Sequence, residues 1–357
     1  AEYGVISQRD FFDHDISNAE NIGGYYVVRN EDFVYNPRIS VTAPVGPVNC
    51  NKLGRNGVMS PLYTVFRTHD IDTTYLEFFK SSYWHSFMFF NGDSGARSDR
   101  FSIKDAVFFE MPIPTPSLEE QRQIGAYMDK LDNLITLHQR KFEKLTNVKK
   151  SMLEKMFPKD GADVPEVRFK GFTGAWKRKR FFELYESVIQ KNDLTYGVDK
   201  NITVASMQYR PDIKVTDIEY LRTYNVLKLG DIAFEGHQSK EFRYGRFVEN
   251  DIGDGIVSHI FAVFRPKTDY DLMFWKYAIN NERIMRPVLV RCTKASTMMN
   301  DLVSKDFLEE SILVPDIEEQ KKIGDYFSQL DKQISFAQFE ISKLQNLKKA
   351  LLEKMFV

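Results

Sequence analysis

The sequence is poor in cysteine and histidine, the residues from which most structural metal sites and disulfide frameworks are built. Cys50 and Cys292 are the only two cysteines among 357 residues, and they lie far apart in the chain. The six histidines have no ligand spacing with one another or with either cysteine. We therefore expect two free thiols, a reducing compartment, which is the cytoplasm, and no metal site.

Long apolar runs are also absent, as is an excess of charge of one sign. No stretch of eighteen apolar residues appears, so we predict neither a membrane span nor a secretory signal. The 49 Lys and Arg against 50 Asp and Glu give a net charge of −1, which argues against a uniformly basic nucleic-acid-binding protein. Local basic clusters still allow nucleic-acid binding, because the field near a surface follows the nearby charges. The length suits two or three domains with cores of their own.

What the sequence does contain is a long internal repeat. Residues 116–157 align with the stretch that begins at residue 315, at an offset of 199 and without a gap, and 21 of the 42 positions are identical. Such a duplication predicts two similar modules, each closed by a helix. Ser117 with Glu120, and Asp316 with Glu319, have the spacing of a capping box at a helix start. Each helix of roughly 38 residues would be about 57 Å long.

Apolar residues recur three and four positions apart along both copies, which is typical of a coiled-coil seam. Helices this long are poorly stable alone in water, so we expect the two copies to pair, and their internal symmetry makes the pair antiparallel. The predicted seam comprises Ile124, Met128, Leu131, Ile135, His138, Phe142, Leu145, Val148, Met152 and Met156 in the first copy, and Ile323, Phe327, Leu330, Ile334, Ala337, Ile341, Leu344, Leu347, Leu351 and Met355 in the second.

The regions outside the repeat consist of short apolar runs broken by Gly, Pro and Asn, which we interpret as strands at Tyr25–Val28, Leu62–Phe66 and Ile260–Phe264. These regions resemble each other faintly: Asp32 aligns with Asp231 at the same offset, and Arg67 with Arg265 one residue out of step. We predict an α+β fold with two mixed α/β heads separated by two long antiparallel coiled-coil helices, related by a pseudo-twofold repeat. The predicted domains are a first head at 1–115, a first helix at 116–157, a linker at 158–170, a second head at 171–314 and a second helix at 315–357.

Ala1 aligns with Lys200, so the lead-in of the second module has no counterpart in the first. We therefore expect about forty residues that resemble 160–199 ahead of Ala1.

Two short motifs resemble catalytic sequences but fit them poorly. Asn36-Pro37-Arg38 lacks the second proline and the aromatic residue of the Asn-Pro-Pro-aromatic signature of amino-methyltransferases. Pro315-Asp316 with Glu319 and Lys321 resembles a nuclease set, yet these residues open a helix, where capping explains them better. With no glycine-rich nucleotide loop after a strand, we predict no catalytic site and no cofactor site.

Polar and basic loops broken by glycine favour DNA contact, because Arg and Lys read guanine, Asn and Gln read adenine, and Lys, Arg, Ser and Thr hold phosphates. For each single residue, a solvated surface charge remains the alternative. The candidate DNA-binding residues are Lys52, Arg55, Asn56, Ser94, Arg97 and Arg100 in the first head, and His237, Gln238, Lys240, Arg243, Tyr244, Arg246, Lys294, Ser296 and Thr297 in the second.

The ends of both helices are retained beyond what a seam requires, which favours a partner surface presented twice; solvated coiled-coil flanks are the alternative. The candidate partner-binding residues are Glu120, Gln121, Glu154, Lys155 and Met156 in the first copy, and Glu319, Gln320, Glu353, Lys354 and Met355 in the second.

Two variable regions, each followed by a Pro-x-x-Glu-Glu-Gln-x-x-Ile-Gly helix that ends in Leu-Glu-Lys-Met-Phe, resemble the specificity subunit of type I restriction–modification systems. The lead-in Val164-Pro165-Glu166-Val167-Arg168-Phe169…Gly174-Ala175-Trp176 resembles the module start of that family.

The resemblance implies that each head is a target recognition domain reading one half of a split double-stranded DNA site, and that the helices set the gap. It also implies that the helices dock two methyltransferase subunits, that restriction/translocase subunits join them, and that this chain catalyses nothing. S-adenosylmethionine, ATP and Mg would then belong to the partner subunits. A coiled-coil scaffold or adaptor, with heads that bind peptides or sugars, is the alternative.

Overall fold

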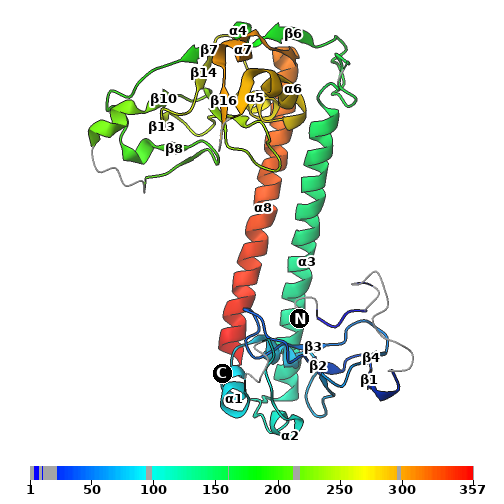
Figure 1. Cartoon of the computed structure of the whole chain (residues 1–357). Coiled ribbons are helices and arrows are strands. Elements are labelled where there is room, and N and C mark those ends of the chain that lie inside the picture. Colours follow the sequence, from blue (N-terminus) through cyan, green and yellow to red (C-terminus); the bar gives the residue numbers. More distant parts are fainter. Residues whose placement is uncertain are drawn as a thin grey trace. The chain divides into compact units, whose positions relative to one another are not determined.

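The structure is a computed structural model that describes residues 4–7, 10, 22–93, 99–159, 161–211, 218–295 and 299–356. The chain divides into two compact units: residues 1–141 with 337–357 form the first, and residues 142–336 form the second. It therefore passes between the units twice, each time inside a long helix, α3 (Leu118–Lys155) or α8 (Ile317–Met355) (Figure 1). Within the described part of the chain, no helix is long and apolar enough to cross a membrane.

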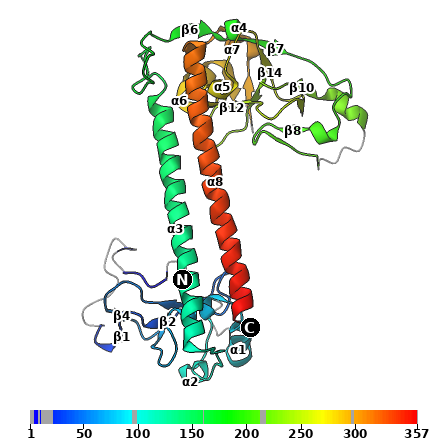
Figure 2. The same ribbon diagram turned by 180° about the vertical axis from the view of Figure 1, so that it is seen from behind.

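Each unit contains half of α3 beside half of α8 (Figures 1 and 2). In the first unit, Lys348 Nζ lies 2.7 Å from both carboxylate oxygens of Asp132. In the second, Lys149 Nζ lies 2.5 Å from Asp331 Oδ1, and both of these residues stand 199 positions from their counterparts. Asp132 of α3 thus contacts Lys348 of α8, whereas Lys149, further along α3, contacts Asp331, which comes earlier in α8. This order confirms that the two helices are antiparallel.

Of the twenty predicted seam positions, ten are buried and nine are half-buried, but one position was predicted wrongly. Leu347 is 40% exposed, whereas Leu352 and Phe356 are buried. The Phe356 ring lies 5.3 Å from that of Tyr75 and 5.7 Å from that of Phe78. At this end α8 packs against the aromatic core of the head, so its buried face no longer follows the seam alone.

The head of the first unit contains small antiparallel sheets and short helices. β2 pairs with both β3 and β5, while β1 pairs with β4. Its elements are η2 (Ile22–Gly24), β1 (Tyr26–Val28), β2 (Phe33–Tyr35), β3 (Val48–Cys50), β4 (Gly57–Met59), β5 (Thr64–Phe66), η3 (Tyr75–Lys80), α1 (His85–Asn91) and α2 (Asp105–Phe108).

The head of the second unit has a larger sheet in the strand order β12-β11-β14-β7, together with four two-stranded pairs. Its elements are β6 (Lys177–Arg180), α4 (Phe181–Leu184), β7 (Tyr185–Val188), η4 (Val198–Lys200), β8 (Ile202–Thr203), β9 (Gln208–Tyr209), η5 (Ile218–Thr223), β10 (Asn225–Leu227), β11 (Ile232–Glu235), β12 (Arg246–Glu249), β13 (Gly255–Val257), β14 (Val263–Pro266), α5 (Leu272–Ile279), α6 (Glu282–Cys292), β15 (Thr293–Ala295), β16 (Asn300–Leu302), α7 (Ser304–Glu309) and β17 (Ser311–Val314).

The three predicted strands exist as β1, β5 and β14: β1 and β5 are shorter than predicted, while β14 is shifted and ends at Pro266 instead of Phe264. β14 starts three residues later than predicted, because Phe261 N–H donates to Ser258 O and closes a turn there.

The faint likeness of the two heads corresponds to the same ion pair in each. Arg67 donates to both oxygens of Asp32, at 2.6 and 3.0 Å, and Arg265 does the same to Asp231, at 2.9 and 2.8 Å. Both carboxylates are buried, so each arginine satisfies a charge that would otherwise be costly inside the head. The aligned aspartates and arginines therefore mark a shared head framework.

Candidate nucleic-acid interface

The two polar loops singled out in the second head meet around one buried side chain, that of Asn300. The backbone N–H of Asn300 donates to Gly236 O at 2.8 Å, and its side-chain Nδ2 donates to Arg243 O at 3.0 Å. Gln238 Nε2 donates to Asn300 Oδ1 at 3.4 Å, and His237 bridges to Met299. A Cβ at Gly236 would collide with the Asn300 carbonyl, so the close approach requires glycine. The loop after β11 and the β15–β16 hairpin thus form one continuous surface.

The first head docks its corresponding hairpin through the same backbone bond. Phe101 N–H donates to Pro37 O at 2.8 Å, 199 positions from the bond between Asn300 and Gly236. Arg100 bridges to Arg38 as Met299 bridges to His237. The two heads therefore present equivalent pairs of loops with different side chains.

Arg38 is a further candidate for DNA contact, and the sequence analysis did not include it. Its side chain is 65% exposed and lies 3.5 Å from Asp99 Oδ2, on the first head's counterpart of the His237 loop. The alignment of Arg38 with His237 at the common offset was the available signal. Arg38 was not identified from the sequence, because Asn36-Pro37-Arg38 was interpreted only as a possible methyltransferase motif.

Most predicted residues of the second head lie on the exposed surface of these loops. His237, Gln238, Lys240, Arg243 and Lys294 are all exposed. The guanidinium of Arg243 lies 5.9 Å from the half-buried Tyr244 ring. Exposed ammonium, guanidinium and amide groups on these loops suit contact with phosphates and base edges.

Arg246 has internal partners instead. Its Nε lies 2.8 Å from Glu235 Oε2, its Nη2 donates to Ala205 O at 2.6 Å, and its guanidinium stacks over Phe242. These contacts explain the residue as part of the head framework. Its role in DNA binding stays a prediction.

In the first head, Lys52 has acidic partners. Its Nζ is 3.4 Å from Asp129 on α3 and 3.7 Å from Glu77, so its charge is balanced. Arg55 Nη2 lies 4.0 Å from Asp10, and Asn56 Oδ1 accepts the N–H of Asn30. The equivalent loop of the second head carries Asp251 and Asp254, so it offers phosphates no matching basic surface. Ser94, Arg97, Ser296 and Thr297 lie outside the described residues.

The retained glutamine of each helix start joins the helix to its own head. Gln121 Oε1 accepts the N–H of Asp72 while its Nε2 donates to Pro116 O, at 3.0 and 2.8 Å. Gln320 makes the equivalent bonds with Asp271 and Pro315, at 3.2 and 3.1 Å. Both side chains are buried, so their retention has an explanation within each unit and needs no partner protein.

Of the capping boxes predicted at the two helix starts, only the side-chain cap by Ser117 in the first copy is confirmed. Ser117 Oγ accepts the N–H of Glu120 at 3.3 Å. The carboxylate of Glu319, in contrast, accepts from Arg168 Nε and Nη2 at 2.6 and 2.7 Å. Glu319 is completely buried, so the prediction of a reciprocal cap there was wrong. The sequence could not reveal a partner 151 residues away.

Among the remaining partner-binding candidates, Glu120, Glu154, Glu353 and Lys354 are exposed. Lys155 lies 3.7 Å from Glu166, while Met156 belongs to the second unit's core and Met355 packs against the core of the first. The role of all ten candidates in partner binding stays a prediction.

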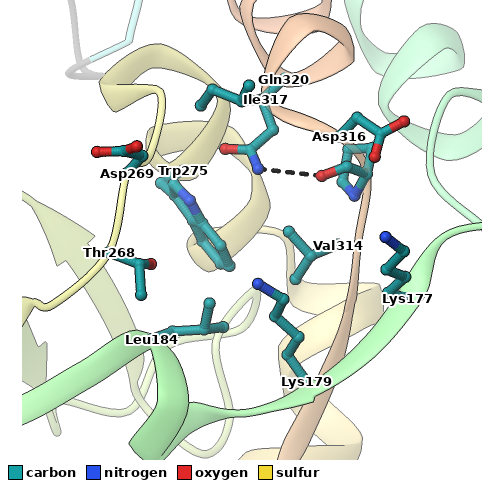
Figure 3. Close-up of a pocket in the computed structure, with 11 residues that line it drawn as sticks. Lys177, Lys179, Leu184, Thr268, Asp269, Trp275, Val314, Asp316, Ile317 and Gln320 are labelled. Atoms are coloured by element: carbon teal, nitrogen blue, oxygen red, sulfur yellow. Dashed lines mark hydrogen bonds between the residues drawn. The ribbon is translucent and has the colours of Figure 1, made fainter.

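A pocket of about 190 Å³ lies where β6 and β17 meet the start of α8 (Figure 3). Lys177 lies on the side of Asp316 and Lys179 on the side of Trp275. Asp269 completes the charged lining, so the two ammonium groups share the pocket with two carboxylates. That balance gives the pocket no preference for an anion over a cation.

The most perturbed acid among the described residues is Glu249 of β12. It is buried, neither carboxylate oxygen has a hydrogen-bond partner there, and the hydroxyl of Tyr185 is likewise unpartnered. Burial raises the pKa of Glu249 well above its usual value of 4.5, and the nearby Asp251 and Asp271 raise this pKa further. It does not line the pocket at α8, so we interpret it as a neutral core residue.

This assignment predicts a specific pH dependence. Folded Glu249 keeps its proton while the unfolded chain loses it above about pH 4.5, so the stability of the second unit falls as pH rises from there through the raised pKa. Glu249→Gln should remove that fall, because an amide needs no proton to stay neutral, so the unit should gain up to about 1.4 kcal/mol for each pH unit between the unfolded and the folded pKa, more at pH 8 than at pH 5. Urea unfolding at pH 5 and pH 8 measures it. An equal effect of the substitution at both pH values would contradict the assignment.

Comparisons with known proteins give a consistent result. The family described as "Type I restriction modification DNA specificity domain" matches residues 11–147 and 189–346. The type I restriction enzyme MjaVIII specificity subunit of Methanocaldococcus jannaschii is 22% identical over 277 residues, which are 70% of this chain; the chain spans 62% of the length of that curated relative.

Two solved structures share the fold. The type I restriction–modification S subunit from M. genitalium aligns with a TM-score of 0.58 and 13% identity, over 96% of this chain and 87% of that one. A structure from work on complex assembly and conformational transition of the type I R-M system aligns with a TM-score of 0.51 and 18% identity, over 92% and 82% of the two chains. At these identities the likeness concerns the fold alone.

Proposed function

Since the chain belongs to the family of type I restriction–modification DNA specificity domains, we propose that it is a non-catalytic subunit that recognises double-stranded DNA for such a complex. One observation carries the proposal furthest. The two heads hold equivalent loop pairs by the same backbone bond, from Phe101 to Pro37 and from Asn300 to Gly236, yet the loops carry different side chains. Each head then reads a different half of a bipartite site.

The two long helices have separate roles in this proposal. They set the gap between the two half-sites, and their exposed ends dock two methyltransferase subunits, which restriction/translocase subunits join. The exposed residues Glu120, Glu154, Glu353 and Lys354 are the candidates for that docking. S-adenosylmethionine, ATP and Mg belong to the partner subunits, and the complex works in the cytoplasm, where its DNA is.

Selection from a random duplex pool tests the function. The chain, alone and with the methyltransferase subunit of its own system, is incubated with the pool at about 50 mM and about 200 mM salt, and bound duplexes are sequenced. We expect two short motifs separated by a fixed unspecified gap, and weaker binding at the higher salt because phosphate contacts release counterions. No duplex affinity under any of these conditions would leave the scaffold alternative as the better account.

A matched pair of variants locates the reading surface. Arg243→Ala should cost about 1–3 kcal/mol at the second half-site if its guanidinium contacts a base. Lys322, an exposed lysine on α8 outside the loops, is the control, and Lys322→Ala should leave the selected motif unchanged.

Lengthening both helices tests the spacer. One heptad is inserted after Lys141 and another after Phe336, the points where the chain passes between units. Seven helical residues add about 10 Å, so the preferred gap should grow by about three base pairs. Seven residues inserted after Gly161, in the loop that follows α3, should leave the gap unchanged. A footprint of wild-type length from the doubly extended variant would disprove the spacer role.

A further inference from the structure

The size of the pocket at the start of α8 limits what it can hold. Its volume of about 190 Å³ is larger than that of an apolar cavity of about 150 Å³ that binds benzene. It is smaller than the roughly 300–1,000 Å³ of pockets that enclose drug-sized ligands. We therefore expect a ligand about as large as a free amino acid, and not a nucleotide.

One part of the lining is apolar and rigid. Leu184 of α4, Trp275 of α5 and Val314 of β17 contribute to it, and each is at most 5% exposed. In the view of Figure 3, the indole of Trp275 separates Asp269 from the ammonium end of Lys179. A ligand with an apolar group gains from contact with this wall, because apolar surface is removed from water.

The other part of the lining carries charges of both signs that are not paired with each other. Lys177, Lys179, Asp269 and Asp316 all line the pocket. Within the described part of the chain, none of these four side chains forms a salt bridge or a side-chain hydrogen bond. Lys179 is also half-buried, and a charge that has lost part of its water gains most from a partner of opposite sign. The pocket thus offers charged groups that a ligand can bind.

Charges of both signs select against a ligand with one charge. A simple anion at Lys179 would lie in the same small pocket as the carboxylate of Asp269, and a simple cation at Asp269 would meet the ammonium of Lys179 in the same way. Like charges held close together are unfavourable. A zwitterion, in contrast, presents a partner to each group.

We propose that this pocket binds a free α-amino acid with an apolar side chain. Lys179 binds the carboxylate of the ligand, Asp269 binds its ammonium group, and the ligand's side chain packs against Trp275. Lys177 and Asp316 lie together on the other side of the pocket, so they add no net charge. Because β6, β17 and the start of α8 all line the pocket, an occupant stabilises the second unit against unfolding. This inference does not depend on DNA recognition.

The probe is L-leucine, titrated into the full chain by isothermal calorimetry up to about 10 mM, so that a dissociation constant near 1 mM is still measured. We expect one L-leucine per chain. N-acetyl-L-leucine lacks the ammonium charge and L-leucinamide lacks the carboxylate, so each should bind at least tenfold more weakly. Equal binding of either analogue would overturn the proposal, since the pocket would then be a site for a simple anion or a simple cation.

Two pairs of variants place the binding in the pocket. Lys179→Ala and Asp269→Asn should each weaken the binding of L-leucine at least tenfold. The controls are Lys305→Ala on α7 and Asp325→Asn on α8, exposed residues outside the pocket lining, and both should bind as the wild type does. Thermal unfolding without ligand, unchanged in all four variants, separates a lost contact from a damaged fold. No binding of L-leucine to the wild-type chain, or full binding by Lys179→Ala and Asp269→Asn, would overturn the proposal.

Discussion

Arg168→Ala is expected to destabilise the second unit by about 3–5 kcal/mol, the range for removing one partner of a buried ion pair. The carboxylate of Glu319 is completely buried, and Arg168 supplies both of its side-chain hydrogen bonds. Hydrogen bonding to Glu319 raises the pKa of Arg168 above its usual value, so the guanidinium stays charged. Alanine would leave the buried carboxyl group of Glu319 without the two hydrogen bonds that Arg168 donates.

Hydrogen exchange resolved by peptide measures this loss, because it reports on each unit separately. Protection in residues 170–330 should fall, while that of residues 22–93 should change little. Glu120→Gln, at the exposed counterpart of Glu319, is the matched control and should change stability by less than about 0.5 kcal/mol. The pair Arg168→Met with Glu319→Leu should recover most of the loss, since buried ion pairs are often replaceable by apolar residues. A loss below 1 kcal/mol in Arg168→Ala would mean that water reaches the carboxylate.

Gly324→Val should be the second most damaging substitution, with a loss of about 1–3 kcal/mol or more from overpacking. A Cβ at Gly324 would lie 2.7 Å from the backbone nitrogen of Phe274 and 2.9 Å from Met273 Cβ. It would also displace Asp271, whose carboxylate caps α5 by accepting the N–H of Phe274 at 2.7 Å. Loss of that cap adds about 1 kcal/mol. Both costs outweigh the better helix propensity of the new residue, which is worth less than about 1 kcal/mol.

Thermal unfolding of Gly324→Val and Gly174→Val separates packing from a general effect of added bulk. A Cβ at Gly174 meets nothing within 4 Å, so that variant should unfold like the wild type. Gly125→Val should act on the first unit as Gly324→Val acts on the second, because a Cβ there would lie 3.0 Å from the backbone of Thr74. If Gly324→Val unfolded at the same temperature as the wild type, the head would have to move away from the helix to accommodate valine.

Much of this architecture could be predicted from the repeat, because helix spacing, caps and turns depend on residues that are close together in the sequence. The antiparallel helices, the Ser117 cap and the three strands follow from spacing and turn chemistry. The match of Asp32 with Asp231 and of Arg67 with Arg265 predicted a shared head, and each aspartate pairs with its arginine.

What sequence reasoning missed depends on contacts between distant residues. Glu319 was assigned a local cap, whereas its partner lies 151 residues earlier. The two loops of the second head were each identified, but their meeting at Asn300 requires the fold of the whole head. Leu347 follows the seam spacing and is nevertheless exposed, because a heptad pattern does not reveal where a globular core replaces the second helix. Which loop residues contact bases stays a prediction.

The burial of Phe356 against Tyr75 and Phe78 has a consequence for biosynthesis. Domains generally fold as units while translation proceeds from the N-terminus. Here the core of the first unit includes Phe356 of the α8 region as well as residues of the head, so this unit cannot close until the second unit and α8 have been synthesised. The second unit consists of one uninterrupted stretch of residues, and it can mature first, against the usual order of translation.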